Sequence, residues 1–327
     1  MVAAQGAAWT KLGCRHTGAD PSVPDDQGPM STMVDLFQAV LLGIVQGLTE
    51  FIPVSSSGHL VLVSHFLGVE TPGIAFDVAL HLGTFGAVLL YFRTDLAYML
   101  AAIVGAGDPA FVRYHRRLAT LLALATIPIA IVGLALRDVF EAAFDAPAAA
   151  AGFLLLTGVL LLLGEAARSR RGGISAPTTN PDPEQVAVGY DAGDQEGLTL
   201  DQVGVRQALV IGFGQCVALF PGVSRSGTTI AAGMSAGLTR PAATRFSFLL
   251  ALPALVGATV VSLPDLAAGN GTFGAPAILA GIAAAFVSGY LAIRWLLALV
   301  ARDRLTVFAW YCFAVGGISL LALAGGV

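Results

Sequence analysis

The sequence predicts an all-α polytopic membrane protein with an inverted-topology repeat, in which each half supplies a re-entrant helical hairpin and three transmembrane helices. Three observations lead to this prediction: the composition, the lengths of the apolar segments and an internal repeat. Hydrophobic residues make up 56% of the 327 residues and charged residues only 12%, about half the charged share of a soluble domain. The 39 glycines fit helices that pack closely in lipid.

The long apolar segments give the predicted membrane spans. Each is read as a full span, because about 20 apolar residues in a helix cross the hydrocarbon core of a bilayer. The six segments are residues 73–92, 118–136, 148–163, 241–263, 275–300 and 305–324.

Shorter apolar segments come in two pairs, and each pair is interrupted by a proline followed by a serine-rich turn. Residues 34–49 and 55–67 flank the turn at Pro53, and residues 203–219 and 224–238 flank the turn at Pro221. These segments are too short to cross comfortably, so we expect two re-entrant hairpins. Broken apolar segments at matching places of two halves indicate a binding site near the membrane midplane.

The two halves match when the first is shifted by 169 residues. This shift carries Gln46 onto Gln215, and it also matches serines and glycines of the two turns. Agreement at polar positions is not what two unrelated apolar stretches would give, so the repeat is real. The predicted organisation is a polar, disordered tail at 1–33, a first repeat at 34–167, a polar acidic loop at 168–202 and a second repeat at 203–327.

Topology follows from counting the crossings. A hairpin returns to its own side and three spans cross, so the second half is upside down and the two hairpin tips can meet. One face then carries most of the arginines, which predicts that it is cytoplasmic in a multi-pass plasma-membrane protein. Both termini are expected outside. These arginines are Arg93, Arg113, Arg116, Arg117, Arg168, Arg170, Arg171, Arg240, Arg302 and Arg304.

Charge and cysteine usage narrow the class of function. The net charge of −4 gives no sign of a nucleic-acid partner, and we expect none. Cys14, Cys216 and Cys312 are far apart and lack metal-ligand spacing, so we interpret them as unpaired packing residues rather than a disulfide or zinc site. Residues 1–33 lack an apolar core and are therefore not a signal peptide.

The first hairpin carries an acidic motif. Gln46 and Glu50 are four residues apart and share a helix face. A carboxylate inside a membrane segment costs about 3 kcal/mol, so it is expected to face a wet, functional interior. The alternative is an interfacial glutamate that reaches water.

The two turns suit a phosphate group. A serine-rich turn at a helix N-terminus offers free N–H groups, hydroxyls and the positive end of the helix dipole, although serine is also a common helix cap. Arg225 in the second turn adds a planar, permanently charged fork. Its anion partner is either Glu50, as a structural pair, or a ligand bridged to both. The candidate substrate-binding residues are Gln46, Ser55, Ser57, Ser224, Ser226 and Thr229.

His59 follows the first turn and is a candidate catalytic residue with Glu50, Ser56 and Arg225. Imidazole transfers protons near neutral pH or attacks phosphorus itself, whereas a lone histidine in an apolar segment is more often a packing residue. A phosphorylated lipid is the natural substrate, because its head reaches the site while its tail stays in hydrocarbon. Asp77 and His81, which lie in the next apolar segment, are left open.

Two long motifs resemble the signatures of the undecaprenyl-diphosphatase, or bacitracin-resistance, family. They are the run from Gln46 to His59 and the run from Pro221 to Thr229. The resemblance implies hydrolysis of undecaprenyl diphosphate at a site reached from the outer face, dependence on a divalent cation such as Mg²⁺ or Ca²⁺, and homodimers. Many members have Glu where this chain has Gln46, which leaves Glu50 as the strong metal-ligand candidate of the motif.

The resulting hypothesis is a phosphatase that recycles the lipid carrier of envelope glycan synthesis. His59 attacks the terminal phosphorus or activates a nucleophile, and Ser56 is the rival nucleophile. A secondary transporter or lipid flippase is the alternative, because inverted repeats with broken helices are transporter architecture. A second lipid-phosphatase class shares the order Ser57-Gly58-His59 but needs further motifs that are missing here. A non-catalytic scaffold would not explain charged residues at both hairpin tips.

Overall fold

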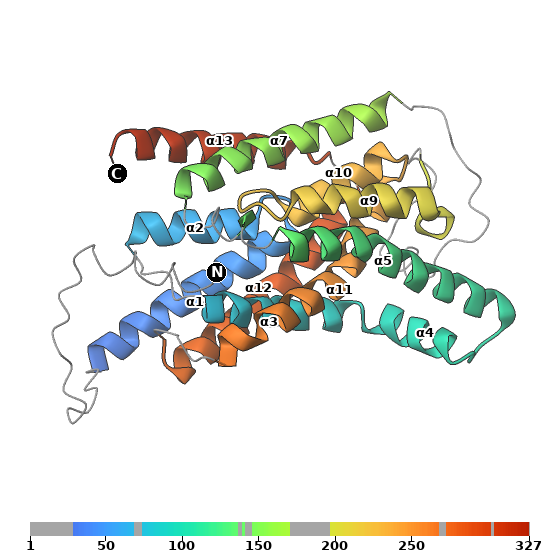
Figure 1. Cartoon of the computed structure of the whole chain (residues 1–327), viewed down its shortest axis with the longest axis horizontal. Coiled ribbons are helices and arrows are strands. Elements are labelled where there is room, and N and C mark those ends of the chain that lie inside the picture. Colours follow the sequence, from blue (N-terminus) through green and yellow to red (C-terminus); the bar gives the residue numbers. More distant parts are fainter. Residues whose placement is uncertain are drawn as a thin grey trace, which may run out of the picture.

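A computed structural model of the chain describes residues 29–68, 74–136, 139–140, 146–170, 197–267, 273–301 and 304–326. Apart from an isolated bridge between Leu198 and Leu238, the regular structure in this part of the chain is helical (Figure 1). The elements are α1 (Pro29–Phe51), α2 (Ser56–Leu67), α3 (Ile74–Tyr91), α4 (Arg93–Ile103), α5 (Pro109–Ala135), α7 (Pro147–Ser169), η2 (Leu200–Gln202), α9 (Val205–Val217), α10 (Arg225–Ser235), α11 (Arg240–Ala267), α12 (Ala275–Val300) and α13 (Thr306–Ala324).

The described helices make this a multi-pass membrane protein. Six of them, α1, α5, α7, α11, α12 and α13, are long and apolar enough to cross a membrane. The pair α3 and α4 passes the same test together and is bent by 73°. The predicted polytopic all-α class is therefore confirmed. The predicted domain boundaries stay a prediction, since the tail at 1–28 and the loop at 171–196 lie outside the described residues, as do Cys14, Arg171 and Arg302.

Two predicted elements differ in detail from the structure. The segment predicted at 34–49 is longer and begins at Pro29, so it reaches the length of a span. The span predicted at 73–92 ends at Tyr91, and the chain then bends into α4, a helix that the sequence analysis did not predict. The ion pair between Arg245 of α11 and Asp95 of α4, 2.7 Å apart, fixes α4 after the bend.

Small residues bring the helices into close contact. Helix α1 packs against α12, and α5 packs against α9. A side chain at Gly43 of α1 would lie only 2.3 Å from the carbonyl oxygen of Gly281 in α12. At Gly212 of α9 it would lie 2.5 Å from that of Ala125 in α5. Both contacts need glycine, as expected for helices that associate in lipid.

Side-chain hydrogen bonds join α4 to α5 and cap the start of α5. Arg116 of α5 donates to the carbonyl oxygens of Ala102 and Ile103 at the end of α4, at 2.6 and 3.0 Å. At the start of α5, the Asp108 carboxylate accepts from the N–H groups of Ala110 and Phe111. These hydrogen bonds hold the pKa of Asp108 below its ordinary value, because they stabilise the charged form.

Two hairpins bring their turns to the middle of the molecule. Helices α1 and α2 form the first hairpin, and α9 and α10 form the second. In Figure 1 the first hairpin extends from the left and the second from the right, and their turns meet near the centre. The candidate site lies at this meeting point.

Candidate active site at the contact of two hairpin turns

Each hairpin turn ends in a capped helix N-terminus. Ser55 caps α2, because its hydroxyl accepts from the N–H of Gly58 at 3.3 Å. Ser224 caps α10 in the same way, accepting from the N–H of Gly227 at 3.0 Å. Ser55 has a φ of 71°, the one positive φ among the described non-glycine residues. A serine in this region is strained and persists only where its surroundings hold it.

The two turns touch, although about 170 residues separate them in the chain. The backbone N–H of Gly222 donates to the Ser57 hydroxyl at 3.4 Å, and the Ser226 hydroxyl donates to the carbonyl of Ile52 at 3.3 Å. A side chain at Gly58 would lie 2.8 Å from the Cα of Gly222. The amino ends of α2 and α10 therefore lie close to each other.

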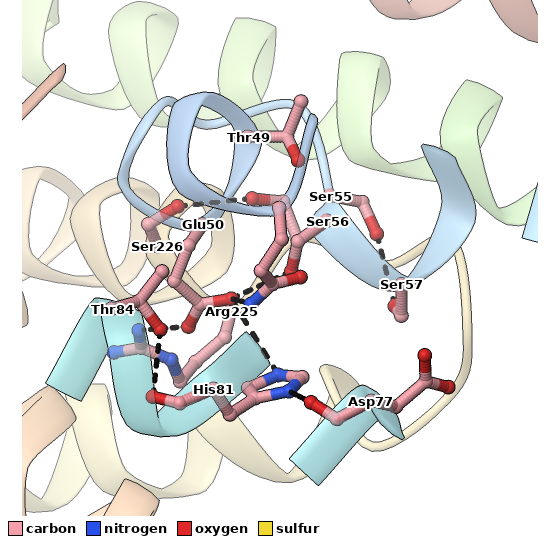
Figure 2. A network of polar contacts seen from close by, with 12 residues as sticks. Thr49, Glu50, Ser55, Ser56, Ser57, Asp77, His81, Thr84, Arg225 and Ser226 are labelled. Carbon is pink, nitrogen blue, oxygen red and sulfur yellow. Dashed lines mark hydrogen bonds and ion pairs between the residues drawn. The ribbon is translucent and has the colours of Figure 1, made fainter. Parts of the chain in front are cut away.

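The Glu50 carboxylate lies at this contact and joins the two hairpins. Its Oε1 accepts from Arg225 Nη2 at 2.8 Å. Its Oε2 accepts from Ser56 Oγ at 2.6 Å and from Gln46 Nε2 at 3.1 Å. Figure 2 shows Arg225 and Ser56 converging on Glu50 from opposite hairpins. Glu50 is only 6% exposed, so its charge depends on these donors.

His81 of α3 also faces this carboxylate (Figure 2). Its Nε2 lies 3.8 Å from Glu50 Oε2, and its Nδ1 lies 2.7 Å from the carbonyl oxygen of Asp77. The side chain is 31% exposed, so it is more accessible than Glu50. The sequence analysis left this histidine open, because its spacing in an apolar segment does not say which face of α3 meets α1.

His59 lies apart from the carboxylate cluster. Its Nδ1 is 2.8 Å from the carbonyl oxygen of Ser55, and its Nε2 is 2.8 Å from the hydroxyl of Tyr311 in α13. The two ring nitrogens therefore bond other groups than Glu50, and the catalytic role of His59 stays a prediction. The ring faces Tyr311 of α13 and bonds the carbonyl of the strained Ser55.

The remaining predicted residues support the second turn. Ser224 donates its N–H to Thr157 Oγ1 of α7 at 2.9 Å, and the same hydroxyl donates to the carbonyl of Gly222 at 2.9 Å. Thr229 is fully buried and bonds the hydroxyl of Ser247 at 2.6 Å, so it does not face the carboxylate. Thr157 was missed because nothing in its local sequence indicates a contact 65 residues away.

Two buried polar atoms of the cluster have no hydrogen-bond partner among the residues that the structure describes. They are Arg225 Nη1, a donor, and Gln46 Oε1, an acceptor. Buried polar groups normally have a hydrogen-bond partner, so these two atoms are available to bond a ligand. A phosphate oxygen would accept from Arg225 Nη1, and a water or cation would suit the amide oxygen.

The protein alone supplies few metal ligands here. Among the described residues, no group of three or more His, Cys, Asp or Glu side chains is placed to hold a metal ion. Both oxygens of Glu50 are already engaged by Arg225, Ser56 and Gln46. The donor set therefore fits a cation that is shared with substrate oxygens better than a resident, all-protein metal site.

Comparison with known proteins identifies the family. The family model described as Bacitracin resistance protein BacA matches residues 39–318. The chain belongs to this family. The residues matched by the BacA model include both hairpin turns and the whole carboxylate cluster.

Several known proteins resemble this chain over nearly their full length. A protein of Methanobrevibacter smithii is 41% identical over 294 residues, which is 86% of this chain and 96% of the relative. A protein of Desulfosudis oleivorans is 43% identical over 86% of this chain and 97% of its own length. A protein of Mycolicibacterium paratuberculosis is 40% identical over 90% of this chain and 99% of its own length. Each carries the name undecaprenyl-diphosphatase.

Proposed function

We propose that this chain is a membrane phosphatase that hydrolyses undecaprenyl diphosphate, or a related polyprenyl diphosphate, to the monophosphate and inorganic phosphate. The observation that carries the proposal is the buried Glu50 carboxylate, held between Arg225 of one hairpin and Ser56 of the other. The family and the names of the relatives support the same reaction. Its product is the lipid carrier that envelope glycan synthesis reuses.

The diphosphate head binds beside the contact of the two turns, at Arg225 and the carboxylate cluster. Arg225 Nη1 is a buried donor without a partner in the described part of the chain, and guanidinium matches the geometry of phosphate oxygens. The amino ends of α2 and α10 both begin at this contact, and each favours negative charge through its dipole and free N–H groups. The prenyl chain stays in hydrocarbon, so the membrane bundle presents the head to the site without extracting the tail.

Ser56 is the nucleophile that the geometry favours. Its hydroxyl donates to Glu50 Oε2 at 2.6 Å, so the carboxylate is positioned to take the proton as the oxygen attacks. The new bond joins Ser56 Oγ to the terminal phosphorus, and the bond from that phosphorus to the bridging oxygen breaks. The electron pair leaves on the lipid monophosphate, while Arg225 stabilises the charge that develops on the phosphoryl oxygens.

Water completes the cycle. It attacks the phosphoserine, the phosphorus–Oγ bond breaks, Ser56 regains a proton, and inorganic phosphate leaves. His59 is the rival nucleophile, but its two ring nitrogens bond Ser55 and Tyr311. Rapid quenching with substrate labelled at the terminal phosphate distinguishes the two residues. We expect an acid-stable label on Ser56, and an acid-labile label on His59 would overturn this assignment.

We further propose that a divalent cation, Mg²⁺ or Ca²⁺, enters together with the diphosphate. Glu50, with Gln46 Oε1 beside it, would hold the cation, and substrate oxygens would complete its ligands. The cation would neutralise part of the diphosphate charge. This arrangement fits a site that offers one carboxylate and no cluster of protein ligands among the described residues.

An inverted repeat is proposed as the origin of the site. The 169-residue shift carries α1 onto the α9 region and α5 onto α12, and the packing pairs α1–α12 and α5–α9 correspond under it. The glycines at the two contacts, Gly43 and Gly212, are also matched by the shift. In Figure 1 the hairpins extend from opposite ends of the bundle, as two oppositely oriented re-entrant hairpins would.

The orientation in the membrane follows from charge. The arginines of α5 and the end of α7 belong to the face assigned to the cytoplasm by the positive-inside rule. Both termini and the opening of the first hairpin would then be outside, so that the site opens to the outer face of the plasma membrane.

A homodimer is proposed from the family resemblance. Light scattering of the protein–detergent complex measures the mass of the protein in it and so tests this proposal.

Phosphate release by the purified protein in detergent tests the function. The substrate is undecaprenyl diphosphate, and the detergent leaves no second compartment, so that transport alone releases nothing. We expect Arg225→Ala and Glu50→Ala to lose nearly all activity, while both elute as the wild type does in size-exclusion chromatography. Wild-type protein that releases no phosphate, with and without Mg²⁺ or Ca²⁺, would overturn the proposal.

A further inference from the structure

Tyr311 of α13 contacts the first hairpin turn from outside the carboxylate cluster. Its hydroxyl lies 2.8 Å from His59 Nε2, and the two rings are parallel within 7° with centroids 5.6 Å apart. The tyrosine is 43% exposed, whereas the histidine is only 7% exposed. Tyr311 belongs to neither hairpin, and neither motif contains it.

The partners of His59 determine how its ring is protonated. The carbonyl oxygen of Ser55, 2.8 Å from Nδ1, can only accept, so Nδ1 carries the hydrogen. In the neutral ring, Nε2 is then the acceptor, and the Tyr311 hydroxyl donates to it. The hydroxyl thus fixes both the tautomer and the orientation of the imidazole.

The same carbonyl belongs to the strained residue of the turn. Ser55 has a φ of 71°, and its carbonyl oxygen accepts from His59 twice, from the backbone N–H at 3.2 Å and from Nδ1 at 2.8 Å. A strained backbone persists only when neighbouring contacts hold it. His59 is therefore a brace on the residue that immediately precedes Ser56.

A second contact from α13 supports this reading. Cys312, the next residue after Tyr311, is buried, and its Sγ lies 3.9 Å from the carbonyl oxygen of Pro53. Helix α13 thus contacts the turn on both sides of Ser55. Because α13 also packs along α7, the turn is held against a fixed support.

We propose that Tyr311 is a positioning residue of the phosphatase site: through the hydrogen bond to His59 Nε2 it holds the Ser55 carbonyl, and thereby Ser56 beside Glu50. The inference rests on the proposed function. Tyr311 touches none of the reacting groups, so its loss lowers the rate of the chemical step and leaves substrate binding almost unchanged.

The test is a double-mutant cycle in the full chain in detergent. Tyr311→Phe removes only the hydroxyl. His59→Asn keeps an amide donor for the Ser55 carbonyl but has no atom that reaches Tyr311. We expect Tyr311→Phe to lower kcat for undecaprenyl diphosphate about tenfold, with KM changed less than about twofold. The double variant should be no slower than His59→Asn alone, because the two residues act as a unit.

The matched control is Tyr98→Phe. Tyr98 lies on α4 and is 46% exposed, and among the described residues it contacts Phe111 and His115 through its ring, so wild-type kcat and KM are expected. The melting temperatures of the wild type, Tyr311→Phe, His59→Asn and the double variant form a second cycle that does not need activity. We expect the losses in melting temperature of the two single variants not to add in the double variant.

Three results would overturn the inference. They are a kcat of Tyr311→Phe equal to that of Tyr98→Phe, a rise in KM without a fall in kcat, and melting-temperature losses that simply add. An inactive wild-type protein would instead remove the proposed function. The melting-temperature cycle would then still report whether Tyr311 and His59 are coupled.

Discussion

Glu50 receives three donors on its two oxygens, and the identity of each donor decides what the site can do. Arg225 and Ser56 come from different hairpins, while Gln46 comes from the same helix one turn earlier. An amide at position 46 adds a neutral donor, where a second carboxylate would add a repelling charge. The carboxylate is therefore held as an anion by the protein alone.

The fork of Arg225 makes the first prediction specific. One nitrogen, Nη2, bonds Glu50, and the other, Nη1, is buried and finds no partner within the described ranges. Lysine keeps the charge, but its single ammonium group cannot take the place of two guanidinium nitrogens that point to Glu50 and to a phosphate oxygen. We expect Arg225→Lys to lower kcat/KM at least about 10²-fold, measured as phosphate release. Arg206→Lys, at an exposed position near the start of α9, is the control, and equal losses in both would contradict the argument.

The amide at position 46 gives a second prediction. Gln46→Glu would bring a second carboxylate to within hydrogen-bonding distance of Glu50, and the two charges would repel unless a cation joined them. We expect the variant to lose more activity than the wild type when EDTA is added, and to regain it at lower Mg²⁺ or Ca²⁺ concentrations. An unchanged cation dependence would show that position 46 does not face the cation.

Sequence reasoning found the cluster but not all of its neighbours. Glu50, Ser56 and Arg225 were predictable, because long motifs and a repeat mark the turns, and a charge in an apolar segment needs a partner. The contacts of His59 and His81 were not, because they depend on directions that local spacing does not contain. His59 bonds Tyr311 of α13 and the carbonyl of Ser55, and the packing of α3 brings His81 to Glu50.

At the scale of elements, the site exists because two helices begin at one point. Neither hairpin contains a complete cluster, since Arg225 lies on α10 and Glu50 on α1. The turns approach until Gly58 and Gly222 are almost in contact. The spacing of the two turns therefore sets the distance from the guanidinium to the carboxylate.

A methyl group at this contact should separate the turns. A Cβ at position 58 would lie 2.8 Å from the Cα of Gly222, and a backbone atom cannot move aside as a side chain does. We expect Gly58→Ala to lower kcat/KM about tenfold or more, since small misplacements are costly in catalysis. Gly152→Ala, on α7 with open space at the Cβ position, is the control. Wild-type activity in Gly58→Ala would show that the turns have room to spare.

The elements also show where pattern reasoning fails. Apolar length predicted most of the spans, because a bilayer demands it. The 73° bend between α3 and α4 was not predictable. The apolar residues of this segment continue through Tyr91, and the ion pair that holds α4 after the bend joins Asp95 to Arg245, 150 residues away. Contacts between distant segments are absent from any local pattern.

At the scale of the whole molecule, the buried ion pair of Glu165 and Arg240 joins helices at the arginine-rich end of the bundle. Glu165 of α7 accepts from Arg240 Nε and Nη2 at 2.7 and 2.6 Å, and from the N–H of Leu305 at 2.9 Å. One carboxylate thus joins α7, α11 and the start of α13. Because α13 carries Tyr311, this clamp also supports the far side of the site.

Removing one partner of this clamp should be costly. Glu165→Ala would leave the Arg240 guanidinium buried without its counter-charge, which typically costs about 3–5 kcal/mol. We expect a clear loss of unfolding free energy in denaturant titrations in detergent. The apolar double variant with Glu165→Leu and Arg240→Met should lose less. A double variant that is less stable than Glu165→Ala would show that the pair itself, rather than the unpaired charge, decides the stability.

The proposed orientation of the hairpins makes the last prediction. If the first hairpin opens outside and the second toward the cytoplasm, residues at the two open ends have opposite accessibility. Leu67 at the end of α2 and Val205 at the start of α9 are 56% and 57% exposed, so a cysteine at either position is reachable from its own side. The background carries serine at Cys14, Cys216 and Cys312, and phosphate release checks that it still folds.

Labelling of each introduced cysteine with a membrane-impermeant maleimide on intact cells then shows on which side of the membrane it lies. We expect Leu67→Cys to label at once and Val205→Cys to label only after the membrane is permeabilised, because a re-entrant hairpin leaves both of its ends on one side. Labelling of both positions on intact cells would mean that α9 and α10 enter from the same face as α1 and α2. The two helix N-termini would then not approach the site from opposite sides of the membrane.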